Sequence, residues 1–316
     1  MEISLEKVSD ILKDNDNFYI LTHQYPDGDT LGSAFALCLA LQKMGKKAKV
    51  INNESIPEKY KFLQSNVKSQ DFEPFFFICV DVANVKLLGP NLEKSYANNI
   101  DLCIDHHRIN EKFSKFRYID PNAAATAEII YEILKIMKLP IDKNIANCIY
   151  TAIATDTGCF KYKNTTSNTH NIAADMINFG ADIFNINKLM FDSKTKEQFL
   201  AEKNILDTIE FYFNDKIAVI CVMLSTLRKT NANDTLVDGI AGIPKQINGV
   251  KIGITFRQKE DKVFKISVRT EENIDAADIC SRFGGGGHTN AAGCTLFGDL
   301  DEVKNKFLEH ASTFLK

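Results

Sequence analysis

Short apolar runs alternate with longer amphipathic stretches through the first half of the chain. Residues 75–80 form a six-residue apolar run, which is typical of a strand buried on both faces of a parallel sheet. Residues 30–44 repeat apolar side chains at helical spacing, and Gly45 follows as a helix cap. The predicted strands cover residues 18–21, 49–51, 75–80 and 100–104, and the predicted helices cover residues 4–14, 30–44, 125–137 and 145–155. This alternation predicts a doubly wound, mostly parallel sheet to about residue 185.

The second half of the chain predicts a smaller α/β domain. Residues 194–213 form a charged amphipathic pattern that predicts a connecting helix. Strands are predicted at 217–223, 250–256, 263–269 and 294–297, and helices at 275–283 and from about 299. We therefore expect an α/β protein with one domain at 1–185, a helical linker at 186–214 and a second domain at 215–316. The active-site cleft is expected between the two domains.

Candidate chemistry begins at the turn after the first predicted strand. The turn reads His-Gln-Tyr-Pro-Asp-Gly-Asp, so that His23, Asp27 and Asp29 lie between a strand and a helix. Open α/β sheets place their active sites at such turns. Imidazole nitrogen together with carboxylate oxygen suits a divalent metal such as Mn²⁺. Taken alone, the same residues also fit a solvated turn in which Asp29 caps the following helix.

Three further sites also bring aspartate to the end of a predicted element. Asp81 and the triplet Asp105-His106-His107 follow predicted strands, and Asp156 ends a predicted helix. If all these ends meet at the carboxyl edge of one sheet, repulsion between like charges and loss of solvation make the cluster costly without cations. The four sites together therefore predict a metal centre.

Composition narrows the class of protein. With 316 residues, 45% of them hydrophobic, the chain can bury the cores of two domains. A net charge of -3 argues against a broad basic clamp for long nucleic acid but is compatible with a short oligonucleotide. The chain has no signal-peptide pattern and no apolar run of about 18 residues, so we expect a cytoplasmic protein without membrane contact. The eight cysteines form no Cys-x-x-Cys pair, which favours reduced, buried thiols.

In these motifs the chain resembles the DHH phosphoesterase superfamily, named for the triplet found here at 105–107. The turn at 23–29, Val80-Asp81 and Thr155-Asp156-Thr157-Gly158 resemble its other N-terminal motifs. The run Gly284-Gly-Gly-Gly-His-Thr-Asn-Ala-Ala-Gly293 is similar to the signature of the DHH-associated domain. The resemblance extends from about residue 15 to the end, and the compact length is similar to the stand-alone nanoRNase type. It implies a catalytic, metal-binding DHH domain at 1–185 and a DHH-associated, substrate-binding domain at 215–316.

The resemblance further implies two Mn²⁺ ions, for which Mg²⁺ or Co²⁺ could substitute. It places His23, Asp27 and Asp81 on the first ion. It places Asp29, Asp81, His106 and Asp156 on the second ion, so that Asp81 bridges the two. Two-metal phosphoesterases hold their ions about 3.5–4 Å apart, and a water or hydroxide shared by both ions is then the expected nucleophile for in-line attack on phosphorus.

Two catalytic residues are expected beside the ions. Asp105 is expected to orient a histidine or a metal-bound water, because imidazoles that bind metals usually hydrogen-bond to a carboxylate. The alternative for Asp105 is a cap at the end of the strand. His107 is expected to contact the phosphoryl oxygens or the leaving group. The alternative for His107 is a packing histidine.

The glycine run predicts a contact with substrate. Gly285, Gly286 and Gly287 offer bare backbone N–H groups to a phosphate or ribose, and His288 follows them. We expect a helix to begin after the run and to favour negative charge there. Arg269, at the end of a predicted strand, resembles the phosphate-binding arginine of the family. The alternatives are a flexible hinge for the glycines and a solvated strand end for the arginine.

The sequence therefore predicts a cytoplasmic, manganese-dependent phosphohydrolase. The nanoRNase resemblance implies cleavage of short oligoribonucleotides or dinucleotides and of 3′-phosphoadenosine 5′-phosphate (pAp). One alternative hydrolase function is a cyclic di-AMP or pApA phosphodiesterase. Another is a pyrophosphatase or exopolyphosphatase, and the glycine motif argues against this one. A non-catalytic nucleotide sensor is the alternative from a different class, although all six candidate ligands are retained. The oligomeric state is left open, with a homodimer as one option.

Overall fold

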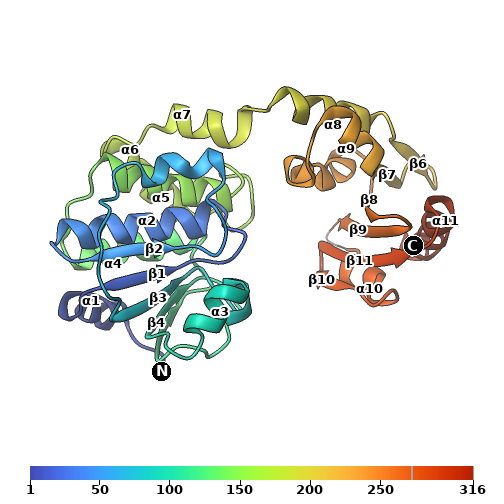
Figure 1. The fold of residues 1–316 in the computed structure, drawn as a ribbon. Coiled ribbons are helices and arrows are strands. Elements are labelled where there is room, and N and C mark those ends of the chain that lie inside the picture. The colour runs from blue at the N-terminus through green and yellow to red at the C-terminus, as the bar shows by residue number, and fades with distance from the viewer. Residues whose placement is uncertain (272, 316) are drawn as a thin grey trace. The chain divides into compact units, whose positions relative to one another are not determined.

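A computed structural model describes residues 1–271 and 273–315 and divides the chain into two compact units. Unit 1 is Met1–Ser193 and unit 2 is Lys194–Lys316. The boundary between them falls inside the range 186–214 that we expected to connect the domains. Each unit has a sheet of its own (Figure 1). Each unit also has its own hydrophobic core.

Unit 1 is built on a five-stranded sheet in the order β2-β1-β3-β4-β5, and its neighbouring strands are parallel. The strands are β1 (Phe18–Leu21), β2 (Ala48–Ile51), β3 (Phe76–Val80), β4 (Leu102–Asp105) and β5 (Phe116–Ile119). The helices are α1 (Leu5–Asp14), α2 (Gly28–Lys43), α3 (Pro90–Tyr96), α4 (Thr126–Ile136), α5 (Lys143–Asp156), α6 (Ser167–Asn178) and α7 (Ile183–Asn187), with shorter helical segments at Glu58–Gln64, Val85–Leu88 and Lys188–Asp192. The predicted doubly wound parallel sheet is confirmed, although the apolar pattern missed β5, α3, α6 and α7.

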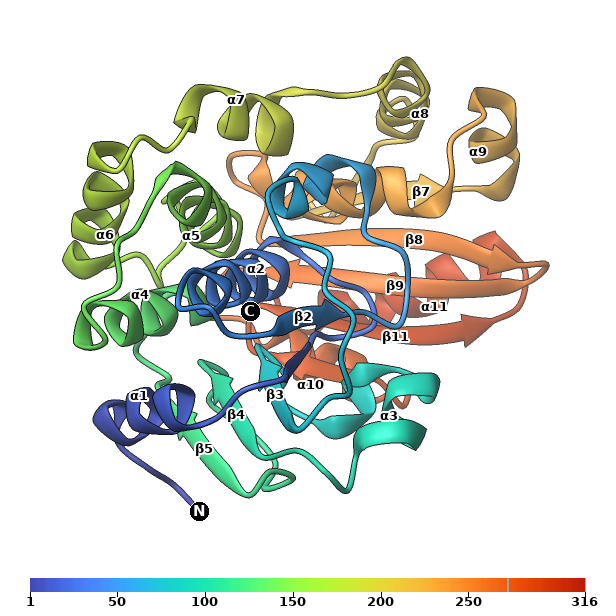
Figure 2. The same cartoon turned by 60° about the vertical axis from the view of Figure 1, so that its left-hand side comes forward.

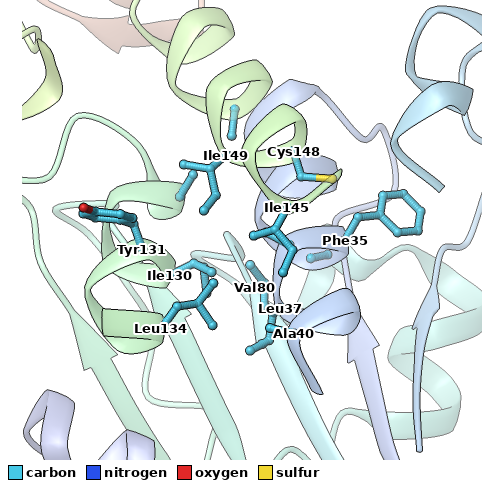
Figure 3. Packing of buried hydrophobic residues seen from close by; sticks show 14 of the residues in the cluster. Phe35, Leu37, Ala40, Val80, Ile130, Tyr131, Leu134, Ile145, Cys148 and Ile149 are labelled. Atoms are coloured by element: carbon cyan, nitrogen blue, oxygen red, sulfur yellow. The ribbon is translucent and has the colours of Figure 1, made fainter. Parts of the chain in front are cut away.

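Hydrophobic side chains cover both faces of this sheet because they alternate along each strand. In β1, Phe18 and Ile20 enter the larger core with helices α1, α2, α4 and α5. Leu21 instead enters a smaller core on the other face, which includes Leu92 of α3. Figure 3 shows side chains of α2, α4 and α5 converging near Val80 of β3. The larger core thus anchors the last residue of β3, directly before Asp81.

Two glycines allow α2 to lie close to α5. A Cβ on Gly28 would overlap the side chain of Thr155, and a Cβ on Gly32 would overlap Ala152. This close approach sets the first turn of α2 beside the last turn of α5, which ends at Asp156. The packing of two helices therefore decides which acidic side chains become neighbours.

Unit 2 contains a six-stranded mixed sheet in the order β10-β11-β9-β8-β7-β6. Its strands are β6 (Glu210–Tyr212), β7 (Ile217–Val222), β8 (Ile252–Glu260), β9 (Val263–Thr270), β10 (Gly286–His288) and β11 (Ala291–Phe297). Its helices are α8 (Lys196–Leu206), α9 (Leu224–Thr230), α10 (Ala276–Ser281) and α11 (Leu300–Ser312), with a 3-10 segment at Asp234–Gln246. Strands β8, β9 and β11 lie side by side in Figure 2. The predicted smaller α/β domain is confirmed.

The expectation of one connecting helix over residues 194–213 is wrong. Helix α8 ends at Leu206, and Glu210–Tyr212 pair antiparallel with β7. Between them, the hydroxyl of Thr208 accepts a hydrogen bond from the backbone N–H of Cys221 at 2.9 Å. Pairing with the sheet satisfies backbone groups that a longer helix would have satisfied internally. This tertiary contact overrides the helical pattern of charges.

Two features of the structure bear on the expectations from composition: the length of its apolar helices and the state of its cysteines. In the described part of the chain, no helix is both long and apolar enough to cross a membrane. All eight cysteines are free thiols, and each of them except Cys159 is buried. Burial raises the pKa of the Cys38 thiol to about 12, so this thiol stays protonated near neutral pH.

Candidate metal centre

The order of strands in unit 1 reverses between β1 and β3. Strand β2 lies on one side of β1, whereas β3 and then β4 follow on the other side. Open parallel sheets bind ligands outside the carboxyl ends of their strands at such a point, because the loops diverge there. His23 comes two residues after β1, and Asp81 directly follows β3. Two of the predicted ligands therefore flank this crevice.

Asp27 and His23 form the first part of the candidate centre. Asp27 caps α2, since its Oδ1 accepts hydrogen bonds from the backbone N–H groups of Asp29 (3.0 Å) and Thr30 (3.1 Å). The Nε2 atom of His23 lies 3.6 Å from Asp27 Oδ1 and 3.9 Å from Asp81 Oδ2. Both distances exceed the length of a hydrogen bond. The three side chains therefore face one another without bonding directly.

Asp29 is buried in the first turn of α2, with 1% of its surface exposed. Its Oδ2 accepts a hydrogen bond from the backbone N–H of Thr126 (2.7 Å), and its Oδ1 accepts one from Ala127 (3.1 Å). Helix α4 has no capping side chain at Ala125. Asp29 therefore caps α4, and the alternative in which it caps the helix after the turn is wrong, because Asp27 holds that position.

Asp81 lies at the middle of the site and has an unusual backbone conformation. Its φ angle is 60°, which is rare for residues other than glycine and costs about 1–3 kcal/mol. The side chain is buried, and its Oδ1 accepts a hydrogen bond from the hydroxyl of Thr126 at 2.9 Å. A buried carboxylate on a strained backbone is the kind of feature that proteins keep for function.

His106 presents one ring nitrogen to three carboxylates. Its Nδ1 lies 3.1 Å from the carbonyl oxygen of Ala123, so we assign the ring proton to Nδ1. The Nε2 lone pair then faces Asp156 Oδ2 at 3.5 Å, Asp81 Oδ1 at 3.7 Å and Asp29 Oδ2 at 3.8 Å. Imidazoles that bind metals usually have their second nitrogen fixed by a carbonyl or carboxylate in this way.

The side chains fall into three overlapping groups, in each of which the potential ligand atoms all lie within 4.8 Å of one another. The groups are His23–Asp27–Asp81, Asp29–His106–Asp156 and Asp81–His106–His107. The first group is the whole donor set expected for the first ion. The second group has three of the four donors expected for the second ion, and Asp81 adjoins it through His106. The structure thus brings all six predicted ligands together.

The electrostatics of the cluster reflect its crowding. Burial raises the pKa of Asp29, and burial together with the Asp29 carboxylate raises the pKa of Asp81 well above its ordinary value. The same two causes raise the pKa of Asp156 to about 7. Without cations, these carboxylates therefore resist ionising together. A bound cation would favour their ionised forms.

Asp105 and His107 form a hydrogen-bonded pair at the end of β4. His107 Nδ1 lies 2.7 Å from Asp105 Oδ1. Asp105 is completely buried, whereas the His107 side chain is 46% exposed. The hydrogen bond to Asp105 raises the pKa of His107. Burial raises the pKa of Asp105, but the hydrogen bonds from His107 and Asn110 and the charge of His107 together outweigh burial and hold this pKa below its ordinary value. The arrangement leaves His107 Nε2 available to another group.

Three residues that the sequence reasoning missed complete the site. Thr126 contacts both Asp29 and Asp81, and the Ala123 carbonyl orients His106. Asn110 donates a hydrogen bond from Nδ2 to Asp105 Oδ2 at 2.7 Å. One signal was present: the predicted helix at 125–137 follows a run of alanines, so its cap had to come from elsewhere in the fold.

Unit 2 holds the remaining predicted site residues. Gly286, Gly287 and His288 form β10, the exposed edge strand of the sheet, which turns back into β11. The expectation that a helix begins after the glycine run is wrong, because β11 follows the run and α10 precedes it. A Cβ on Gly285 would overlap Cys294, so part of the run is explained by close packing. The unpaired side of an edge strand still offers backbone N–H groups.

Arg269 and His288 share a register position in this sheet. His288 pairs with Ala291, which in turn pairs with Arg269 of β9. Residues directly opposite each other on neighbouring strands project to the same face, so Arg269 and His288 lie on one side of the sheet. The substrate-contact candidates of unit 2 thus lie at one edge of the sheet: Gly286, Gly287 and His288 form β10, Gly285 precedes it, and Arg269 lies two strands away in β9.

Comparison with known families matches residues 17–153 to the DHH family, N-terminal domain, and residues 214–316 to the DHHA1 domain. The chain belongs to the DHH family. Its two matched regions occur in the order that the motifs predicted, so the family resemblance is confirmed. The first region includes His23, Asp29, Asp81 and the Asp105-His106-His107 triplet, and ends before Asp156.

Relatives in the DHH family match the chain over nearly its whole length. It is 29% identical over 311 residues to a protein of Thermus thermophilus named bifunctional oligoribonuclease and PAP phosphatase NrnA, covering 96% of this chain and 91% of that protein. It is 26% identical over 291 residues to a probable NrnA of Streptococcus mutans, covering 90% and 91%. The structure of an exopolyphosphatase-related protein from Bacteroides fragilis has a TM-score of 0.87 and 23% identity, covering 98% of this chain and 96% of that one. The last likeness confirms the fold.

Proposed function

We propose that this DHH-family protein is a phosphohydrolase that uses two divalent metal ions, with Mn²⁺ as the expected metal. The general type of reaction follows from the family: the chain is a hydrolase of phosphoester bonds. One observation carries the two-ion proposal. Asp81 faces His23 with Oδ2 and His106 with Oδ1, so its two oxygens belong to two different donor groups. A carboxylate in this position is suited to bridge two ions.

The donor atoms of the site fit divalent cations. The contacts from the Nε2 atoms of His23 and His106 to the carboxylate oxygens are 3.5–3.9 Å, too long for hydrogen bonds. Imidazole nitrogen with carboxylate oxygen is a donor set that Mn²⁺ accepts. When bound, two such cations supply Lewis acidity to a phosphoryl group and lower the pKa of a shared water.

The residues around the ions have separate tasks in this proposal. Asp105 fixes the Nδ1 proton of His107, so that Nε2 of His107 can donate a hydrogen bond or a proton to a phosphoryl or leaving-group oxygen. Thr126 and Asp29 hold the ligand cluster at the N-terminal end of α4. In unit 2, Arg269, His288 and the bare backbone of Gly285–Gly287 bind the terminal nucleotide of the substrate.

Short oligoribonucleotides, dinucleotides and pAp are the proposed substrates. Two relatives with NrnA in their names support this choice, because each aligns over most of its own length. A net charge of -3 also favours short substrates over long nucleic acid. The cytoplasmic location remains a prediction of the sequence.

A panel of turnover assays tests the proposal. The protein with Mn²⁺ is given pAp, linear dinucleotides, a 5-mer RNA, cyclic di-AMP and pyrophosphate side by side. We expect nucleoside monophosphates from the dinucleotides and the 5-mer, and inorganic phosphate from pAp. Exclusive hydrolysis of pyrophosphate would overturn the substrate class. Binding of nucleotides without turnover of any of these compounds would favour the sensor.

A further inference from the structure

A pocket of about 240 Å³ opens beside the candidate metal centre within unit 1. Its lining residues are Asp27, Lys59, Tyr60, Thr155, Asp156, Met190 and Phe191. Asp27 and Asp156 belong to different donor groups of the centre. The pocket therefore adjoins both proposed ions, and a substituent of a phosphate bound to them can enter it.

The other walls of the pocket have a different chemistry from the metal centre. Met190 and Phe191 come from the Lys188–Asp192 segment and are half-buried against the main core. Tyr60 is buried, and the Lys59 ammonium lies 4.8 Å from the centre of the Tyr60 ring. An aromatic ring, a thioether and a cation in one small pocket suit the base of a nucleotide and its phosphate better than they suit a metal or a water.

The pocket is also held firmly in place. Tyr60 belongs to the larger buried core of unit 1, together with apolar side chains of α2 and α5. Gly28, next to Asp27 in the first turn of α2, packs tightly against Thr155, the neighbour of Asp156. The apolar walls and the proposed metal ligands are thus joined through α2 and α5. A ligand in the pocket would keep a fixed distance from the ions.

We infer that this pocket binds the second nucleoside of an oligonucleotide, the one across the scissile phosphate from the terminal nucleotide. Its base lies against Phe191 and Met190, and Lys59 pairs with the next phosphate along the strand. The inference rests on the proposed function, in which unit 2 binds the terminal nucleotide. The volume is below the roughly 300–1,000 Å³ of sites for drug-sized ligands, which agrees with one nucleoside rather than a longer segment. Since pAp has a single nucleoside, it leaves the pocket vacant.

Phe191→Leu in the full chain with Mn²⁺ tests the base contact, because pAp serves as an internal control substrate. We expect KM for a dinucleotide to rise about tenfold while KM and kcat for pAp stay unchanged. Phe184→Leu is the matched control, since Phe184 is 74% exposed on α7 and lies outside the pocket lining. A purely structural role for Phe191 would shift both substrates together. That result, or no shift for the dinucleotide, would overturn the inference.

Lys59→Gln tests the phosphate contact. The wild type should bind a trinucleotide more tightly than a dinucleotide, and Lys59→Gln should remove this preference without changing KM for pAp. Lys61→Gln is the matched control, because Lys61 lies on the same 3-10 segment and pairs with Glu58. An unchanged preference in Lys59→Gln would remove this residue from the subsite.

The inference and the proposed function fail in different ways. If the wild type hydrolyses both substrates but the pocket variants match it, only the inference falls. If the wild type hydrolyses neither, the proposed function falls. In that case, calorimetric titration of the Mn²⁺-loaded wild type and pocket variants with the same dinucleotide and with pAp still tests whether the pocket binds the second nucleoside.

Discussion

The carboxylate of Asp29 accepts a hydrogen bond of 2.7 Å from the backbone N–H of Thr126, although the two residues lie 97 positions apart. The hydroxyl of Thr126 donates in turn to Asp81. One residue at the start of α4 therefore fixes two of the proposed ligands. Groups that orient metal ligands in this way typically change metal affinity by about 10–100-fold when they are removed.

Thr126→Val should consequently weaken Mn²⁺ binding by about 10–100-fold, since Asp81 loses its hydroxyl donor while the shape of the side chain is kept. Thr126→Ser retains the hydroxyl and should bind Mn²⁺ like the wild type. Isothermal titration calorimetry of the two variants measures the difference. Equal affinities would show that the hydroxyl does not orient Asp81.

Asp81→Asn should reduce turnover of dinucleotides to the background level, because the proposed bridge between the ions is lost. The fold should survive, and the metal-free variant should melt at a higher temperature than the metal-free wild type, since a buried carboxylate with a raised pKa has been removed. Asp71→Asn, at an exposed position, is the matched control. Activity of Asp81→Asn within tenfold of wild type would contradict the two-ion proposal.

Asp105→Asn should move the alkaline limb of the pH–rate profile to lower pH. The hydrogen bond that His107 donates to Asp105 raises the pKa of His107, so its loss lowers that pKa. If His107 acts in its protonated form, activity then disappears at a lower pH as the pH rises. Steady-state kinetics across the neutral range give the profile. His107→Asn should lower kcat by about 10²–10⁴-fold. If the alkaline limb of the profile stays at the same pH in Asp105→Asn, the group that titrates there is not His107.

The metal-free protein should lose stability as the pH rises from 6 to 8. Burial and neighbouring carboxylates raise the pKa of Asp29, Asp81 and Asp156, that of Asp156 to about 7. Acids with a raised pKa stabilise the fold most when protonated, and this contribution is lost as the pH rises through the raised pKa.

Thermal melting in the presence of a chelator measures this loss, and added Mn²⁺ should flatten the dependence. Asp156→Asn should reduce the slope in the metal-free state. The lowered pKa of Asp27 and Asp105 affects stability only at more acidic pH. A melting temperature that increases from pH 6 to pH 8 in chelator would refute the crowding of carboxylates.

His288→Ala should raise KM for dinucleotides by about tenfold and leave Mn²⁺ affinity unchanged, because His288 lies in unit 2 with the proposed nucleotide contacts. His170→Ala, at an exposed position in unit 1, is the control. Kinetics and calorimetry on the same preparations separate the two effects. Unchanged kcat and KM in His288→Ala would remove this residue from the site.

The sequence by itself determined the arrangement of elements that carries the site. Apolar runs and helical spacing predicted β1, α2, β3, β4, α4 and α5 close to their observed bounds. His23, Asp27, Asp29, Asp81, His106 and Asp156 were identified because each lies in a motif at the end or start of such an element. Each of these signals comes from residues that are neighbours in the chain, so it is visible in the sequence without knowledge of the fold.

Only the tertiary structure decided what surrounds those residues. Thr126 became a partner of Asp29 because α4 begins where the first turn of α2 is buried. The glycine run became an edge strand because β11 was available to pair with it. Phe191 reached the pocket beside Asp156 through the packing of its segment against the main core. Such contacts join positions far apart in the chain and leave no periodic pattern, because their energies depend on burial and hydrogen-bond geometry that exist only after folding.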